Sequence, residues 1–316
     1  MAFSIFDYSN TNMLHRKALL RAIESVNAMG IEHEDITVVV STRNMIRVLP
    51  QVIFCRMKTV INIVGFGRLY SDYGIFGRFV FNLIVWFHDR TTARAFIVEH
   101  DVDKTLLERF VRRPVFTTHG SGFSTEGFTR KRKLPGKILQ IGYLSRFDKS
   151  KGSHEVLKAA QILPVNRHLI IAGRDIKGER FSKKFSELAQ ARDNVTFLGE
   201  LHSRSEVSQF FNALDLFLSP SVREGGNIAL QEAIWHGVPF LTTDAPGCQV
   251  LANIFRCEAV PMNEFGSRVA SYTPVKPSNH QQWKTLIQPF KSINVESEYY
   301  KILINIRSNL VKLENR

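Results

Sequence analysis

The 316-residue chain is long enough for about two domains. Its 44% hydrophobic and 22% charged residues are ordinary for a globular protein and exclude a disordered, collagen-like or coiled-coil chain. The net charge of +13 at pH 7 favours an anionic partner, and three classes fit: nucleic acid, an anionic membrane surface and a phosphorylated small molecule.

The first half of the chain predicts an α/β domain, residues 1–134, in which three strands are visible. Apolar runs predict strands at Thr37–Val40, Thr59–Val64 and Ala95–Val98. Helical periodicity predicts helices at His15–Ala28 and Phe76–Ala93.

A charged segment with linker composition, Thr129–Gly136, separates the two halves. It contains Pro135 and Gly136 and has no apolar period, so we place the domain boundary after Leu134. Its basic run, Arg130–Lys133, is explained more simply as a solvated linker than as a nucleic-acid site, because no aromatic side chains are interleaved with it. Nucleic acid is therefore not an expected partner.

The second half, residues 135–294, alternates strands and helices regularly. The predicted strands are Ile138–Leu144, His168–Ala172, Asn194–Leu198, Asp215–Ser219 and Pro239–Thr243. The predicted helices are Ser153–Leu163, Phe181–Gln190, Glu206–Leu214 and Ile228–His236, the last of them ended by Gly237. This alternation is typical of a parallel sheet covered by helices on both faces.

The remaining segment, residues 295–316, predicts one long amphipathic helix over Val295–Glu314. The longest apolar stretch of the whole chain, Phe79–Phe87, is nine residues, far from the roughly 20 that cross a bilayer. No secretory signal is visible, and the three cysteines, Cys55, Cys248 and Cys257, are scattered and fit buried small hydrophobes. These observations predict a cytoplasmic protein.

Loops that follow the carboxyl ends of parallel strands are the first place to look for a ligand site. The segment Gly142–Gly152 offers Arg146, Lys149 and Lys151 directly before a predicted helix N-terminus, where free backbone N–H groups and the helix dipole favour an anion. Two interpretations have equal weight here, a phosphate site and a solvated basic loop.

A second loop, Ser219–Glu232, combines two carboxylates with a glycine pair. Glu224 follows a strand, Gly225 and Gly226 leave backbone N–H groups uncovered, and Glu232 lies two turns into the next helix. Carboxylates accept hydrogen bonds from sugar hydroxyls, and bare amides at a helix start take a phosphate or hydroxyl oxygen. The alternative makes Glu224 an ordinary loop acid and Glu232 a surface helix residue.

Other residues carry weaker signals. His88, His100 and His119 have no metal-ligand spacing, so we predict no metal site. The stretch Tyr73–Arg94 joins a bulky apolar run to arginines, which fits either a membrane interface or, more simply, a core helix.

Several segments in order resemble glycosyltransferase family 4, the retaining nucleotide-sugar enzymes of the GT-B fold. They are Thr118–Phe128, Asn194–Gly199, Asp215–Ser221, Arg223–Ala233, and His236–Pro239 followed by Thr243–Cys248. The Pro246-Gly-Cys248 ending is most similar to members that build bacterial surface polysaccharides such as capsule, O-antigen or exopolysaccharide. The resemblance implies two Rossmann-like domains facing a cleft, with the C-terminal helix crossing back to the first domain.

The resemblance also implies residue roles. Glu224 would contact the donor sugar, and Glu232 would hold the ribose hydroxyls of a UDP- or GDP-sugar. The amides of Gly225, Gly226 and Asn227 would face the sugar and pyrophosphate. Together Arg146 and Lys151 would neutralise the diphosphate leaving group, without a metal or other cofactor.

Two features depart from the family pattern. Members commonly have Arg directly after the glycine of the first strand in the second domain, where this chain has Tyr143. The first domain shows no opening strand with a glycine turn and no clear counterpart of the histidine that many relatives place in the cleft, so we expect it to be shortened.

The resemblance predicts a cytoplasmic enzyme at the inner face of the cytoplasmic membrane. It would transfer a hexose or amino sugar to a saccharide linked to a lipid diphosphate, with the positive charge holding it near anionic lipid. The alternative is a degenerate or truncated GT-B protein that binds a nucleotide sugar or a partner without catalysis.

Overall fold

The computed structural model describes residues 2–6, 13–29, 36–55, 57–64, 66, 73–120, 122–129, 136–176, 178–222, 227–273 and 280–314. The chain forms two compact units. Unit 1 comprises Met1–Phe123 together with Pro289–Arg316, and unit 2 comprises Ser124–Gln288. The predicted boundaries after residues 134 and 294 lie later in the chain than these divisions.

Unit 1 contains a parallel five-stranded sheet in the order β1-β2-β3-β4-β5. Its strands are Phe3–Phe6 (β1), Ile36–Val40 (β2), Lys58–Ile63 (β3), Ala93–Val98 (β4) and Val115–Thr117 (β5). The sequence predicts the three central strands and misses β1 and β5. Both are short edge strands, which bury less apolar surface and leave a weaker pattern.

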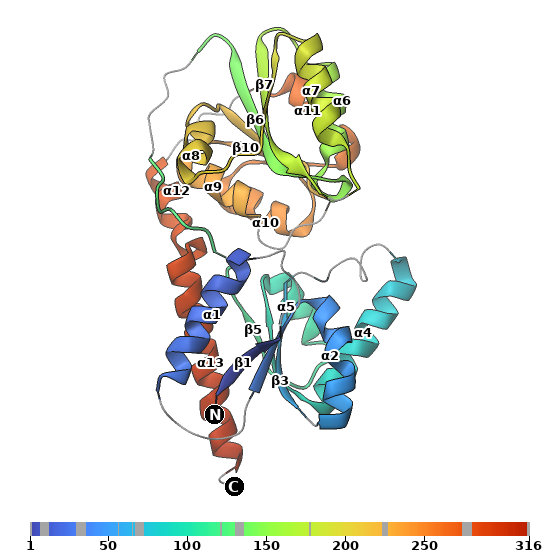
Figure 1. Ribbon diagram of the computed structural model, residues 1–316, viewed down its shortest axis with the longest axis vertical. Coiled ribbons are helices and arrows are strands. Elements are labelled where there is room, and N and C mark those ends of the chain that lie inside the picture. Colours follow the sequence, from blue (N-terminus) through green and yellow to red (C-terminus); the bar gives the residue numbers. More distant parts are fainter. Residues whose placement is uncertain are drawn as a thin grey trace. The chain divides into compact units, whose positions relative to one another are not determined.

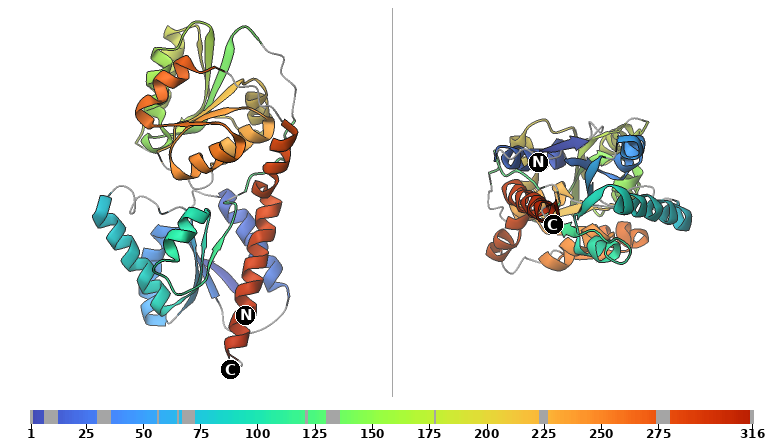
Figure 2. Two further views of the ribbon diagram at one scale, coloured as in Figure 1. Left: turned by 180° about the vertical axis from the view of Figure 1, so that it is seen from behind. Right: turned by 90° about the horizontal axis from the view of Figure 1, so that it is seen from below.

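Helices cover both faces of this sheet (Figures 1 and 2). They are Met13–Asn27 (α1), Thr42–Cys55 (α2), Gly74–Thr91 (α4), Asp101–Leu107 (α5) and Ser292–Glu314 (α13). One core lies under α1 and α13, and a second lies under α2, α4 and α5. Alternate residues of β2 enter opposite cores, with Val38 and Val40 in the first and Val39 in the second.

Unit 2 contains a parallel six-stranded sheet in the order β11-β10-β9-β6-β7-β8. Its strands are Leu139–Phe147 (β6), Arg167–Asp175 (β7), Val195–Gly199 (β8), Leu216–Ser219 (β9), Phe240–Thr243 (β10) and Glu258–Val260 (β11). The five predicted strands are confirmed, and β6 extends three residues beyond its predicted end to Phe147.

The helices of unit 2 follow its strands in alternation. The α-helices are Ser153–Gln161 (α6), Phe181–Ala191 (α7), Arg204–Asn212 (α8), Ile228–His236 (α9), Pro246–Phe255 (α10), Phe265–Ser271 (α11) and His280–Leu286 (α12). Short 3-10 helices span Lys149–Lys151 (η1), Met262–Glu264 (η2) and Gln288–Phe290 (η3). Gly237 ends α9 with φ 76°, which is the C-terminal role the sequence predicts for it.

The α/β class and the pair of parallel sheets are therefore confirmed. No helix in the described ranges has both the length and the apolar character that a membrane span requires.

Candidate functional site

The two predicted ligand loops of unit 2 lie beside each other at the carboxyl edge of the sheet. Strands β6 and β9 are neighbours, and each leads into one of the loops. The Val222 N–H donates to the Ser150 carbonyl at 2.9 Å, which joins the loops directly. A Cβ added to Gly152 would lie 1.9 Å from the Pro220 carbonyl oxygen, so this close approach requires glycine.

The basic loop is held by Asp148 and Tyr143. The Asp148 carboxylate accepts the Lys151 N–H at 2.9 Å, and the Tyr143 hydroxyl donates to the Lys151 carbonyl at 3.0 Å. Gly152 then takes the left-handed conformation with φ 69°, and α6 begins at Ser153. These contacts fix the backbone around Lys151, whose side chain is half-buried.

The longer strand corrects the interpretation of Tyr143 and Arg146. Because β6 reaches Phe147, Arg146 lies on the strand close to its carboxyl end and is exposed, rather than in a longer loop. Tyr143 is 1% exposed and stacks on Phe147 in the core. Tyr143 is therefore a core residue that supports the basic loop. The chain has no arginine at this position, and Arg146 is the arginine that lies near the end of the strand.

Three predicted site residues, Glu224, Gly225 and Gly226, lie outside the described residues. Asn227 is described, and its side chain is fully used inside the fold. Its amide nitrogen donates to the Ser219 hydroxyl at 2.6 Å, and its amide oxygen accepts the Leu230 N–H at 3.1 Å. Asn227 thereby caps α9 and ties its start to the end of β9.

Glu232 is buried rather than at the surface, which overturns the alternative that it is a surface helix residue. The residue is 5% exposed, and its Oε1 accepts a hydrogen bond from Arg204 Nη1 at 2.7 Å. Burial raises the pKa of the Glu232 carboxyl, and the positive charge and hydrogen bond of Arg204 oppose that rise. Arg204 thus favours the carboxylate form that a ligand hydroxyl needs as an acceptor.

Arg204 is a residue of this site that the sequence does not predict. Its guanidinium lies 3.9 Å from the centre of the Phe128 ring and also donates to the Ser124 carbonyl. It therefore joins the start of unit 2 to α8 and α9. The nearest sequence signal is the capping box of Ser203 and Glu206, which fixes where α8 begins but does not reveal the partners of Arg204.

Unit 1 places two histidines after neighbouring strands. His100 follows β4 and precedes α5, and His119 follows β5. The His119 Nδ1 lies 2.6 Å from a carboxylate oxygen of Glu298 on α13, and this hydrogen bond raises the pKa of His119. His88 is buried in α4, and burial lowers its pKa.

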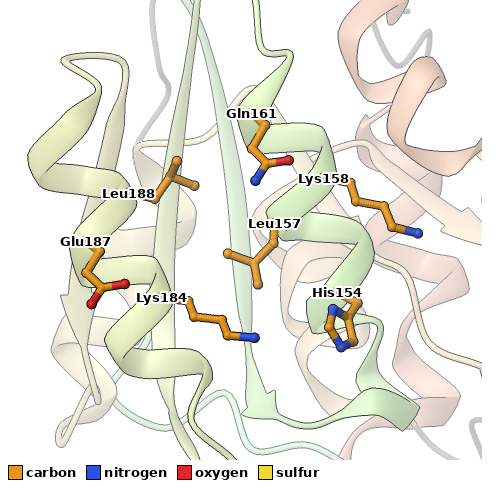
Figure 3. Close-up of a pocket in the computed structure, with 7 residues that line it drawn as sticks. All are labelled: His154, Leu157, Lys158, Gln161, Lys184, Glu187 and Leu188. Carbon is orange, nitrogen blue, oxygen red and sulfur yellow. The ribbon is translucent and has the colours of Figure 1, made fainter.

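A groove of about 410 Å³ lies between α6 and α7 and contains none of the predicted site residues. Figure 3 shows Lys184 of α7 extending towards α6. Lys158 of α6 pairs with Glu155 at 2.8 Å. His154 packs edge-on against Phe181. The groove is thus separate from the two ligand loops.

Residues 125–254, which include both ligand loops, Arg204 and Glu232, match the family model of glycosyl transferases group 1. This segment is therefore similar to group 1 glycosyl transferases. The match covers most of unit 2 and none of the first 124 residues.

Two curated bacterial proteins are similar to part of this chain, and one of them is a lipopolysaccharide glucosyltransferase by name. The chain is 29% identical over 196 residues to the protein CapJ of Staphylococcus aureus, with 58% of this chain and 48% of CapJ covered. It is 37% identical over 117 residues to the lipopolysaccharide glucosyltransferase WaaG of Escherichia coli, with 35% of this chain and 28% of WaaG covered. The chain thus spans less than half the length of these relatives.

Solved structures confirm the GT-B fold of this chain. Alr3699/HepE of Anabaena, solved with UDP and glucose, has a TM-score of 0.69 at 14% identity, with 96% of this chain and 100% of that chain covered. Sucrose-phosphate synthase of Thermosynechococcus elongatus has a TM-score of 0.68 at 14% identity, with 96% and 81% covered.

Proposed function

We propose that the protein is a retaining glycosyltransferase of family 4. It transfers a hexose or amino sugar from a UDP- or GDP-sugar to a saccharide linked to a lipid diphosphate, in the synthesis of a surface polysaccharide. The observation that carries this proposal is the contact between the two ligand loops within the matched domain, through Ser150, Gly152 and the Pro220–Val222 segment. UDP and UDP-glucose in the HepE structures support the donor, and the name of the lipopolysaccharide glucosyltransferase WaaG supports the pathway class.

The donor nucleotide in this proposal is held by α9. In the described part of the chain Arg204 bonds Oε1 of Glu232, and we assign Oε2 to a ribose hydroxyl. A ribose hydroxyl donates to a carboxylate, so Glu232 must be ionised when the nucleotide binds. Arg204 sustains that ionisation against the cost of burial.

The donor sugar and diphosphate occupy the loops. Glu224 contacts the sugar, and the amides of Gly225, Gly226 and Asn227 face the sugar and pyrophosphate. Arg146 at the end of β6 and Lys151 before α6 neutralise the negative charge that develops on the departing diphosphate. Such preorganised charge is commonly the largest single contribution to catalysis.

The proposed reaction proceeds on one face of the sugar. The acceptor hydroxyl attacks from the side that the diphosphate leaves, and a leaving phosphate oxygen takes the hydroxyl proton, so the anomeric configuration is retained. The charge for this step comes from Arg146 and Lys151, and we expect activity without an added divalent metal.

The lipid-linked acceptor places the enzyme at the inner face of the cytoplasmic membrane in this proposal. A net charge of +13 attracts the chain to anionic lipid and to the acceptor diphosphate. The membrane contact is peripheral.

A transfer assay with Glu224→Ala tests the catalytic proposal. We expect transfer to fall by at least about 100-fold, as for loss of a group that acts in the transition state, while the thermal unfolding curve is unchanged. Glu187→Ala is the matched control, because Glu187 is an exposed acid on α7 in the same unit. Near-normal turnover by Glu224→Ala would contradict the proposal.

A degenerate or truncated GT-B protein that binds a nucleotide sugar or a partner without catalysis is the alternative function. Binding of UDP or GDP without transfer to any lipid-linked acceptor would favour this alternative.

A further inference from the structure

Helix α4 of unit 1 has two apolar faces. One face is buried in the core and includes Phe81, Val85 and His88. The other is in solvent and consists of Ile75, Phe76, Phe79, Leu83 and Trp86, which are 47% to 87% exposed. At about 100° per residue these five side chains occupy roughly 100° of the helix circumference, opposite the buried face. The interpretation of this segment as a core helix therefore applies to the buried face of α4 and does not account for its exposed apolar face.

Helix α2 continues this exposed apolar region. The two helices cover the same face of the sheet, and the His88 ring on α4 lies 3.1 Å from the Met45 carbonyl of α2. In Figures 1 and 2 they lie next to each other outside the sheet. We define the α2–α4 surface as Ile46, Ile53, Phe54, Ile75, Phe76, Phe79, Leu83 and Trp86, all of which are exposed.

The clustering of these side chains is unusual for a soluble surface. Among the described residues, about half of the exposed large apolar side chains belong to the α2–α4 surface or to Tyr73 beside it. Single exposed apolar residues are normal, whereas the α4 side chains are neighbours at i, i+3 and i+4 spacing on one helix face, and such a contiguous patch marks an interaction site.

The exposed charges on α2 and α4 themselves have one sign. Arg43 and Arg47 lie on α2, and Arg78 and Arg90 lie on α4. Arg90 also lies over the Trp86 ring at 5.9 Å. The single acid of the two helices, Asp89, is 2% exposed. It accepts the backbone N–H groups of Arg112 and Arg113 and pairs with Arg90, so Arg43, Arg47 and Arg78 carry the cationic character of the surface. The solvent side of the surface is thus apolar and cationic.

We propose that the α2–α4 surface docks the protein on a bilayer that contains anionic lipid, with α4 lying in the plane of the interface. The apolar side chains enter the boundary between headgroups and acyl chains, and the arginines bind lipid phosphates. This inference rests on the proposed membrane contact and names the part of the chain that makes it. The surface belongs to unit 1, whereas the donor loops belong to unit 2.

Charge decides between a bilayer and a second copy of the chain as the occupant. Two copies facing each other through this surface would bring Arg43, Arg47 and Arg78 of both copies together and would have no exposed acid from these helices to offset them. Anionic headgroups supply the missing negative charge.

Sedimentation with vesicles of phosphatidylcholine, with and without phosphatidylglycerol, tests the proposal on the full chain. We expect Phe76→Asp/Phe79→Asp to lower the partition coefficient for anionic vesicles by at least about tenfold, because two large apolar side chains no longer enter the interface. Val165→Asp is the matched control, since Val165 is 89% exposed in unit 2, and it is expected to bind as the parent protein does.

Reversing the charge of two arginines separates the electrostatic contribution to vesicle binding from the contribution of the apolar side chains. Arg43→Glu/Arg47→Glu is expected to lower partitioning to anionic vesicles by about tenfold or more and to leave binding to phosphatidylcholine alone unchanged. Trp86 supplies a spectroscopic readout, because its fluorescence should shift to shorter wavelength on vesicles and Trp86→Phe should remove that shift.

Three results would overturn the inference. They are no preference of the parent protein for anionic vesicles, unchanged binding by Phe76→Asp/Phe79→Asp, and an equal loss in Val165→Asp. A parent dimer that dissociates in Phe76→Asp/Phe79→Asp would also overturn it and assign the surface to self-association. Thermal shift with UDP and GDP is measured on the same samples, so failure of membrane docking is distinguished from failure of the proposed donor site.

Discussion

Each unit has an ion pair near the carboxyl edge of its sheet, and the two pairs differ in burial. In unit 2 the Glu232 side chain is 6% exposed and pairs with Arg204. In unit 1 the Glu298 side chain is 27% exposed and pairs with His119, which is 45% exposed. Both carboxylates lie on helices. Their partners follow strands in the chain, with Arg204 at the start of α8 after β8 and His119 after β5.

The difference in burial teaches what each pair does. A carboxylate removed from water loses much more when its partner is deleted than one that water still reaches. Glu232 therefore depends on Arg204 for its charge, which suits a group that must accept a ligand hydroxyl. Glu298 and His119 can separate at a small cost in free energy, because water still reaches both side chains. Their role is to hold the segment after β5 against α13.

The largest expected effect comes from the backbone that supports the unit 2 edge. Gly152→Ala would place a Cβ 1.9 Å from the Pro220 carbonyl oxygen at a residue with φ 69°. We expect a loss of about 2–4 kcal/mol in the free energy of unfolding, because both strain and a backbone clash are introduced. Denaturant unfolding measures it. Gly178→Ala, also at positive φ but with no atom within 4 Å of the added Cβ, is the control and should lose clearly less.

Removing Arg204 tests directly whether the charge of the buried Glu232 carboxylate depends on Arg204. Arg204 is 39% exposed, so we discount the cost of a fully buried pair and expect Arg204→Met to lose about 1–3 kcal/mol at pH 8. The pKa of Glu232 is raised by burial above its ordinary 4.5, so its ionisation costs stability as pH rises through the folded-state pKa. Without Arg204 that pKa rises further.

The deficit of Arg204→Met relative to the parent protein should therefore shrink between pH 8 and pH 5, as measured by urea unfolding at several pH values. Adding Glu232→Gln to Arg204→Met should remove this pH dependence. A deficit that is equal at both pH values would show that Arg204 acts through packing on Phe128 alone.

The exposed pair of unit 1 should give the smallest effect. Because the hydrogen bond to Glu298 raises the pKa of His119 above 6.5, the stability that it contributes is full below pH 6.5 and is lost as pH rises through the folded-state value. His119→Gln should lose less than about 1 kcal/mol at pH 6 and almost nothing at pH 9. A larger loss at pH 9 than at pH 6 would have the wrong sign for this pair.

The sequence predicts unit 2 better than unit 1 for physical reasons. In unit 2, strands such as His168–Ala172 alternate with helices such as Phe181–Gln190 at regular intervals, and each helix has one apolar face. In unit 1, α2 contains Pro50 within the helix, which ordinarily indicates a break, and its exposed face is also apolar. The helical period is therefore obscured.

The site is predicted in part. The spacing of Glu224 and Glu232 and the family resemblance point to the donor loops, and the structure brings those loops together. The partnership of Arg204 with Glu232 joins α8 to α9, and no local pattern encodes such a tertiary contact. The core position of Tyr143 depends on the full length of β6, and helix and strand ends are the least predictable parts of a pattern.

The donor site is tested most directly by thermal-shift titration of the full chain with UDP and GDP, in the parent protein and in Glu232→Gln. A ligand bound by the native state alone raises the unfolding temperature. Glu232→Gln keeps the size of the side chain and removes the charged acceptor of the ribose hydroxyls, and Glu187→Gln controls for loss of an acid elsewhere in unit 2. We predict a shift with one of the two nucleotides that Glu187→Gln retains and Glu232→Gln loses. No shift with either nucleotide, or an equal shift in Glu232→Gln, would contradict the assignment of this edge as the nucleotide-sugar site.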